Sequence, residues 1–152
     1  FEKAHLKAAE YWYSQARYPE FCREMETLIA YTPFNHSPYQ YTVQNLLQAE
    51  QFRPAIPFLK GRIALGEQDA FSLKWLGIAL MTEREFGPAI DYMEQARRLT
   101  PSDAQLLYNL AGAYGFSGRL GEALQALEDC LKVDPQFPGA RLMADELKQH
   151  LR

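Results

Sequence analysis

At 152 residues, the chain has the length of one domain or of a short array of repeats. Its hydrophobic content of 47% is sufficient for a packed core, and its net charge of -3 comes from 16 basic and 19 acidic residues without a long run of either sign. No basic stripe could follow a phosphate backbone, and no apolar run approaches the length of a membrane span. We therefore expect no nucleic acid among its partners and no membrane span.

The segment 2–35 predicts a helical hairpin. Its two halves each place apolar or small side chains at helical spacing, and the second half restarts at Pro19. Proline suits the first turn of a helix because its missing N–H has no intrahelical partner there. Pro33 follows the expected end of the second helix. The residues at the repeated apolar positions are His5, Ala8, Ala9, Trp12, Phe21, Met25 and Leu28.

The segment 36–69 repeats this pattern less regularly. We expect Ser37 to cap its first helix and Pro54 to begin its second helix. Packing from neighbouring hairpins on both sides is expected to hold this segment in place. The positions that weaken its second helix or replace the closing proline are Pro57, Gly61, Gly66 and Glu67.

The segments 70–103 and 104–137 carry the pattern most clearly. In the second of them, Leu110 and Ala123 are expected to fill the space between two helices that reverse at Gly118. A helix cannot continue through proline, so a proline is expected just beyond the second helix of a hairpin. The prolines at that position are Pro33, Pro101 and Pro135, separated by one or two periods of 34 residues.

The last hairpin is expected to have a defined start and a cover at its end. Ser102 and Gln105 predict a capping box, and Asp103 adds negative charge at the helix N-terminus. Residues 138–152 then predict one more amphipathic helix, which covers apolar surface that a terminal hairpin cannot bury by itself. Its apolar stripe is Leu142, Met143, Leu147 and Leu151. In total we predict nine helices and no sheet.

A helix pair that returns every 34 residues without an insertion resembles the tetratricopeptide repeat (TPR) family. The resemblance implies a single domain over residues 1–152, with repeats at 2–35, 36–69, 70–103 and 104–137 and a capping helix at 138–152. The implied fold is all-α, a right-handed superhelical α-solenoid of four TPR helix hairpins plus a C-terminal capping helix. In the third repeat the residues that carry the resemblance are Leu73, Leu76, Gly77, Leu80, Ala89, Met93, Ala96 and Pro101.

In the TPR family, the first helix of each repeat lines a concave groove that binds a peptide segment of a partner protein. Carried over residue by residue, the groove positions in this sequence include Lys3, Leu6, Glu10, Gly112 and Gly115. We expect the two glycines to leave a hollow into which a side chain can insert. The residues predicted to bind peptide are Tyr13, Gln40, Gln44, Leu47, Lys74, Ile78, Met81, Tyr108, Asn109 and Phe116.

The chemistry of these positions favours one kind of ligand. Lys3 and Lys74 are the only cations among them, so the carboxylate clamp of chaperone-binding TPR domains is not expected. The mixture of aromatic, aliphatic and glutamine side chains suits an extended or helical peptide anchored by apolar residues. We therefore predict a protein–protein interaction scaffold. Two alternatives stay open: a C-terminal accessory or regulatory domain of a larger multidomain enzyme, and a self-association module that forms a homo-oligomer.

Sequence signatures of an enzyme are missing. The glycines follow no nucleotide-binding spacing. His5, His36 and His150 belong to different repeats and are not placed to form a metal site with the cysteines. We predict no catalytic residue, no cofactor and no metal for this chain.

The two cysteines bear on the cellular compartment. Cys22 and Cys130 fall in the second helices of the first and last repeats, too far apart for an intramolecular disulfide, and are expected to be core thiols. Free thiols fit a reducing compartment, and we predict a cytoplasmic location. The sequence begins at Phe1 without a methionine or signal peptide, as expected of a fragment or processed chain.

Overall fold

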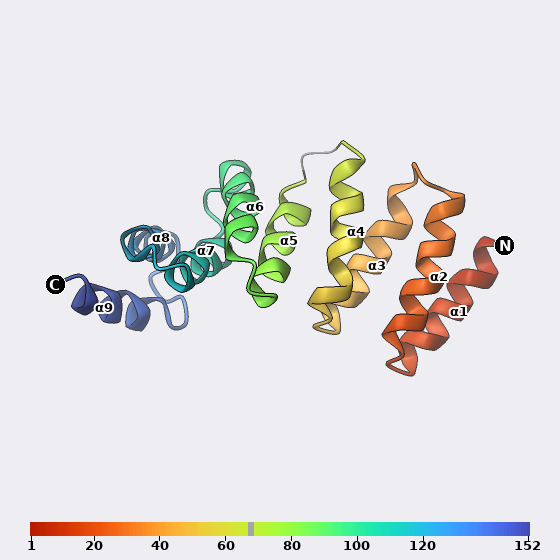
Figure 1. The fold of residues 1–152 in the computed structure, drawn as a ribbon, viewed down its shortest axis with the longest axis horizontal. Helices are drawn as coiled ribbons and strands as arrows, with labels where there is room; N and C mark the ends of the chain where they lie inside the picture. Colours follow the sequence, from red (N-terminus) through yellow and green to blue (C-terminus); the bar gives the residue numbers. More distant parts are fainter. Residues whose placement is uncertain (67–68) are drawn as a thin grey trace. The chain divides into compact units, whose positions relative to one another are not determined.

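The chain is built from paired helices in the computed structural model, which describes residues 1–66 and 69–152 (Figure 1). The first helices of the pairs are α1 (Glu2–Ser14), α3 (His36–Gln48), α5 (Ala70–Thr82) and α7 (Ala104–Phe116), and the second helices are α2 (Tyr18–Tyr31), α4 (Phe52–Ala64), α6 (Phe86–Leu99) and α8 (Leu120–Val133). The last helix is α9 (Ala140–His150). For the described residues, the prediction of nine helices and no sheet is confirmed. Crossing a bilayer would take a longer and more apolar helix than any that these residues form.

Helix boundaries recur at the predicted period. First helices begin 34 residues apart, and so do second helices. The N-caps of α3, α5 and α7 are Asn35, Asp69 and Asp103, whose side chains each accept a backbone N–H bond. The predicted caps Ser37 and Ser102 were therefore wrong. At the start of each of these helices, the first N–H groups have no partner within the helix. The side-chain oxygen of an asparagine or aspartate, which recurs there at intervals of one period, caps them instead of a serine hydroxyl.

One left-handed residue makes the turn inside each helix pair. The four positions are Ala16, Glu50, Arg84 and Gly118, with φ between 55° and 79°. In each turn the following N–H bonds to the carbonyl five residues earlier, at 2.8–2.9 Å. Glycine adopts this conformation without a steric penalty, and the sequence predicted it for Gly118 alone. At the other three turns the hydrogen bond and the packing of the helix pair hold a conformation that a β-carbon disfavours.

The described helices divide into two compact units. Unit 1 contains α1 to α4, and unit 2 contains α5 to α9. The division falls between the second and third predicted repeats. The organisation of the whole chain as a single domain stays a prediction.

Unit 1 has a core drawn from all four of its helices. The second repeat, which carries Pro57 and Gly61 inside α4, is held by close packing. A β-carbon added to Gly61 would lie 2.5 Å from the Tyr39 ring, so this glycine is what allows α3 and α4 to approach. Glu67, predicted to replace the closing proline, lies outside the described residues. Core side chains with no exposed surface are Ala9, Phe21, Met25, Val43, Leu46, Ala55 and Leu59.

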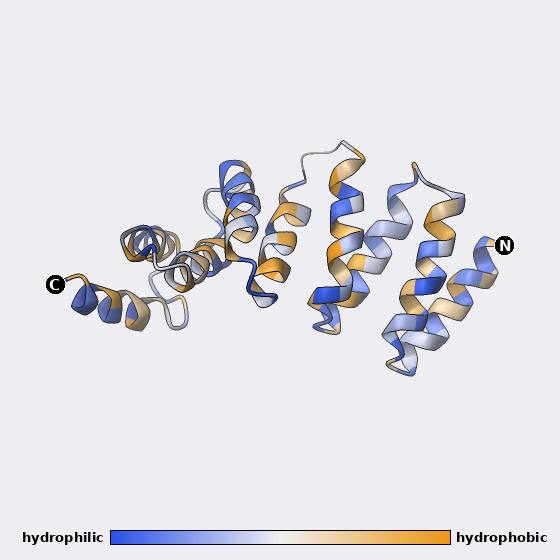
Figure 2. Ribbon diagram, viewed as in Figure 1, coloured by the Kyte–Doolittle hydropathy of each residue, from blue (hydrophilic) through white to orange (hydrophobic). Residues whose placement is uncertain are grey.

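In unit 2, α5 and α6 approach each other closely at Gly77. A β-carbon there would overlap Met93 and would lie 3.0 Å from the carbonyl oxygen of Ala89. At the other end of the unit, α9 covers the last helix pair, as predicted, and Figure 2 shows its apolar residues on an otherwise polar helix. The cluster that it joins consists of Leu107, Ala111, Ala126, Leu127, Cys130, Ala140 and Ala144. Of the predicted apolar stripe, Met143 and Leu147 pack against this cluster, whereas Leu142 and Leu151 are exposed.

Both cysteines are free. Cys130 is buried, and its thiol donates to the carbonyl oxygen of Ala104 at 3.3 Å. Burial, together with the charge of Asp134, raises the pKa of the Cys130 thiol. Cys22 is half-buried, and desolvation, followed by the charge of Glu26, raises its pKa to about 11. Cys130 is therefore the core thiol that the sequence predicts, whereas Cys22 keeps part of its surface exposed.

Candidate functional site

An apolar hollow of about 260 Å³ opens between α7 and α9 in unit 2. It exists because Gly112 and Gly115 place no side chain on this part of α7. A β-carbon on Gly115 would meet nothing within 4 Å, which shows how open the surface is at that position. The lining residues, none of which carries a polar side chain, are Ala111, Gly112, Gly115, Phe116, Leu120, Met143 and Leu147. We call this feature the α7–α9 hollow.

Phe116 forms an exposed aromatic wall at the hollow. Its side chain is 70% exposed, although a phenyl ring gains free energy from burial. The ring stacks on Phe86 of α6, with centroids 5.4 Å apart and an interplanar angle of 12°. That contact fixes the orientation of the ring while leaving most of its surface free.

The two predicted residues at the end of α5 have different surroundings. Met81 is half-buried, and its sulfur lies 3.8 Å from the position that a β-carbon on Gly112 would take, so it borders the hollow. Ile78 is only 6% exposed and belongs to the core. Met81 therefore keeps exposed surface beside Gly112, whereas Ile78 is withdrawn into the core.

Lys74, the cation expected on the same face, already has a partner. Its Nζ atom lies 2.7 Å from Oδ2 of Asp103, the N-cap of α7. The same Nζ lies 5.7 Å from the centroid of the Trp75 ring. Lys74 lines a depression of about 210 Å³, but its charge is engaged in holding the start of α7.

Tyr108 and Asn109 are also committed to the fold. The Tyr108 ring lies 5.1 Å from that of Phe137, and its hydroxyl occupies the space beside Gly139. Asn109 donates through its side-chain amide to the carbonyl oxygen of Gln105 at 2.8 Å. Phe116 lines the hollow and Tyr108 does not, because Tyr108 packs against the connection between α8 and α9.

The predicted residues of unit 1 are dispersed. Tyr13 donates to the carbonyl oxygen of Asn45 at 3.2 Å, and its ring contacts Phe21, so it joins the two hairpins of this unit. Leu47 is half-buried. Gln40 and Gln44 are exposed, but neither is among the residues that line the cleft between α1 and α3.

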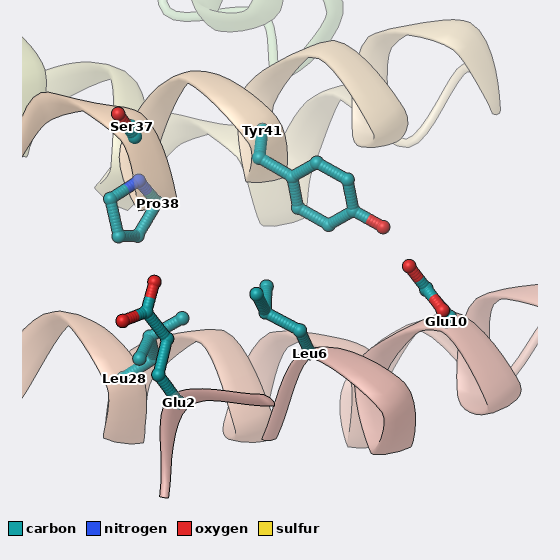
Figure 3. A pocket seen from close by; sticks show the side chains of 7 residues that line it. All are labelled: Glu2, Leu6, Glu10, Leu28, Ser37, Pro38 and Tyr41. Atoms are coloured by element: carbon teal, nitrogen blue, oxygen red, sulfur yellow. The ribbon is translucent and has the colours of Figure 1, made fainter. Parts of the chain in front are cut away.

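A cleft of about 240 Å³ does lie between α1 and α3 in unit 1 (Figure 3). It is lined by Glu2, Leu6, Glu10, Leu28, Ser37, Pro38 and Tyr41. Figure 3 shows the carboxylates of Glu2 and Glu10 toward opposite ends, with Leu6 between them. We call it the α1–α3 cleft. Residue-by-residue transfer indicated Leu6 and Glu10, but the cleft as a unit was missed. The available signal was the four-residue spacing of Glu2, Leu6 and Glu10, which places all three on one face of α1.

Comparison with known sequences places the last hairpin in a family. Residues 104–137 match the family model of the tetratricopeptide repeat. These are the limits predicted for the fourth repeat. Over 74 residues, the chain is 31% identical to the Hsp70-Hsp90 organising protein of Plasmodium falciparum. The aligned region is 49% of this chain and 29% of that relative, so the chain spans less than a third of its length.

Solved structures show the same fold. The crystal structure of MamA superimposes with a TM-score of 0.81 at 20% identity, covering 93% of this chain and 83% of that one. The first TPR of Spaghetti, bound to the HSP90 peptide SRMEEVD, gives a TM-score of 0.70 at 16% identity and covers 76% of this chain and 92% of that one. The predicted all-α TPR-type solenoid is thereby confirmed as the fold class.

Proposed function

Since this chain belongs to the tetratricopeptide repeat family, we propose that it is an interaction scaffold whose α7–α9 hollow receives an apolar side chain from a peptide segment of a partner protein. The TPR fold is a protein-interaction scaffold rather than a catalytic one. The observation that carries the proposal is the open apolar surface at Gly112 and Gly115 beside the exposed ring of Phe116.

The composition of the hollow determines what it can bind. Its lining is apolar throughout, so an inserted leucine, methionine or phenylalanine side chain would exchange water for carbon contacts. Burying one such side chain contributes roughly 1.5–3 kcal/mol. That gain suits one anchor within a longer contact, because association also costs translational and rotational freedom. Phe116 of α7 and Met143 of α9 both line the hollow and would contact such an anchor.

An acidic peptide end is a poorer fit to this unit. Lys74 is the sole basic residue of α5, α7 has none, and both helices lie wholly within the described residues. Because Lys74 is paired with Asp103, a terminal carboxylate on this face finds no unpaired cation in either helix. The ligand that we propose is therefore defined by an apolar anchor and not by negative charge.

Filling the hollow tests this proposal. Peptides selected from a random displayed library against the wild-type chain are measured by isothermal titration calorimetry against Gly115→Leu and Gly121→Leu. Neither substitution meets an atom within 4 Å of the new β-carbon, and Gly121 does not line the hollow. We expect Gly115→Leu to weaken binding at least tenfold and Gly121→Leu to leave it unchanged. Equal affinity of the peptides for all three proteins would show that the hollow is not where they bind.

A further inference from the structure

We propose that the α1–α3 cleft binds an extended segment of a partner protein with the pattern basic–x–apolar–x–basic. This cleft belongs to unit 1 and is separate from the α7–α9 hollow. The inference adds a second recognition surface of different chemistry and does not depend on the function proposed for the hollow.

The spacing of three side chains on α1 defines the pattern. Glu2, Leu6 and Glu10 follow one another at four-residue steps and lie along one face of the helix. With a rise of 1.5 Å per residue, the two carboxylates stand about 12 Å apart along the axis, with Leu6 midway. In an extended peptide, alternate residues point the same way at about 3.3 Å per residue, so positions i and i+4 are separated by about 13 Å. A basic residue at each of these positions and an apolar one at i+2 match the three side chains of α1.

The middle of the cleft is apolar. Leu28 and Pro38 are buried and Leu6 is half-buried, so they form a carbon surface between the two helices. An apolar side chain placed at i+2 would cover this surface and exclude water from it. A ligand with two charges and no apolar centre lacks that contact, which is why a protein segment fits better than a simple polyamine.

The two carboxylates are available to a cation. Two other acids of unit 1 are paired, Glu24 with His5 and Glu20 with Arg17. Within residues 1–66 and 69–152, no ion pair or side-chain hydrogen bond engages Glu2 or Glu10. The charge of Glu10 also acts inside the cleft: after burial, it is the next cause that raises the pKa of the Tyr41 hydroxyl. A bound lysine or arginine would neutralise this charge.

Fluorescence anisotropy with labelled peptides tests the pattern on the whole 152-residue chain. The probe is Lys-Ser-Leu-Ser-Lys flanked by glycines, and the comparison peptides are the rearranged Lys-Leu-Ser-Ser-Lys and the charge-reversed Glu-Ser-Leu-Ser-Glu. We expect the ordered peptide to bind most tightly, the rearranged one more weakly and the acidic one not at all. Equal binding of the ordered and rearranged peptides would overturn the proposed pattern, and so would equal competition by spermidine.

Matched variants locate the binding. Glu2→Gln and Glu10→Gln should each weaken the ordered peptide about two- to fivefold, the range expected for an exposed ion pair, and the double variant should weaken it further. Glu26→Gln removes the same charge from an exposed residue that does not line the cleft and should change nothing. Unchanged affinity in the double variant would refute the assignment. Gly115→Leu should bind this probe normally, so failure at the hollow and failure at the cleft are distinguishable.

Discussion

Lys74 on α5 and Asp103 at the start of α7 lie 2.7 Å apart, from Nζ to Oδ2. The other oxygen of the same carboxylate accepts the backbone N–H of Leu106 at 3.0 Å. One aspartate therefore caps a helix and ties it to the equivalent helix of the preceding repeat. Lys74, which the sequence predicts to bind peptide, is therefore engaged in an ion pair that stabilises the fold.

This double role predicts an unequal response to two substitutions. Asp103→Ala removes both the cap and the ion pair and should lower the free energy of unfolding by about 1–2 kcal/mol, chiefly through the lost cap. Asp103→Asn keeps an acceptor oxygen and loses mainly the charge, so its cost should stay below about 1 kcal/mol. Urea unfolding followed by circular dichroism provides both values. If the two variants are equally destabilised, the ion pair and not the cap dominates.

Leu110 tests the packing of the last helix pair. Both Leu110 and its predicted neighbour Ala123 have no exposed surface. Leu110→Ala should lower the free energy of unfolding by roughly 2–5 kcal/mol, because it removes buried contacts and leaves a cavity. A denaturation midpoint close to that of the wild-type chain would show that this core is described wrongly.

Two glycines on first helices predict opposite effects of the same change. Gly77→Ala should destabilise unit 2 by about 1–3 kcal/mol, since the new methyl overlaps Met93 and crowds the backbone of Ala89. Gly115→Ala meets nothing within 4 Å and should stabilise the protein by up to about 1 kcal/mol through helix propensity. Thermal melts of the two variants beside the wild type provide the comparison. A gain in melting temperature for Gly77→Ala would mean that α5 and α6 are not in close contact there.

The raised thiol pKa of Cys22 predicts slow alkylation. The thiolate is the reactive form, and with a pKa of about 11 only about one thiol in a thousand is ionised at pH 8, against about one in ten for an ordinary pKa of 9.0. Because the pKa is raised, reactivity should increase as pH rises toward 11. Iodoacetamide labelling followed by mass spectrometry should show slow modification of the folded chain at pH 8 and rapid modification in urea. Rapid labelling of Cys22 in the folded chain at pH 8 would contradict its burial.

The same raised pKa has a defined effect on stability. The folded state keeps Cys22 protonated where the unfolded state releases the proton, so this contribution is complete below pH 9 and is lost as pH rises from about 9 to 11. Cys22→Ala should make the pH dependence of unfolding shallower in that window.

The repeat period made most of the fold predictable from sequence. Apolar spacing and Pro33, Pro101 and Pro135 located the helix pairs, and each proline stands two residues beyond a second helix. The caps were less predictable because serine, asparagine and aspartate all cap helices, and local sequence does not say which residue meets the free N–H groups. The left-handed residues Ala16 and Arg84 were not predicted, since neither side chain favours that conformation.

The candidate surfaces were predictable only in part. The glycine pair of α7 indicated a hollow, because missing side chains leave space wherever a helix is exposed. That Met143 and Leu147 of α9 complete it depends on how α9 packs, which local spacing does not encode. The engagement of Lys74 depends on the register between α5 and α7, and the burial of Ile78 depends on the packing around α5.

Replacing the left-handed turn residues by glycine should make this chain more stable to heat. A side chain with a β-carbon in the left-handed conformation costs roughly 1–2 kcal/mol, which glycine avoids. The greater conformational freedom of glycine in the unfolded state offsets roughly 0.5–1 kcal/mol of that gain. Ala16, Glu50 and Arg84 are three such positions, and none lines the hollow or the cleft. Glycine at these turns should therefore raise the thermal stability of the protein without changing either surface that we assign to a partner.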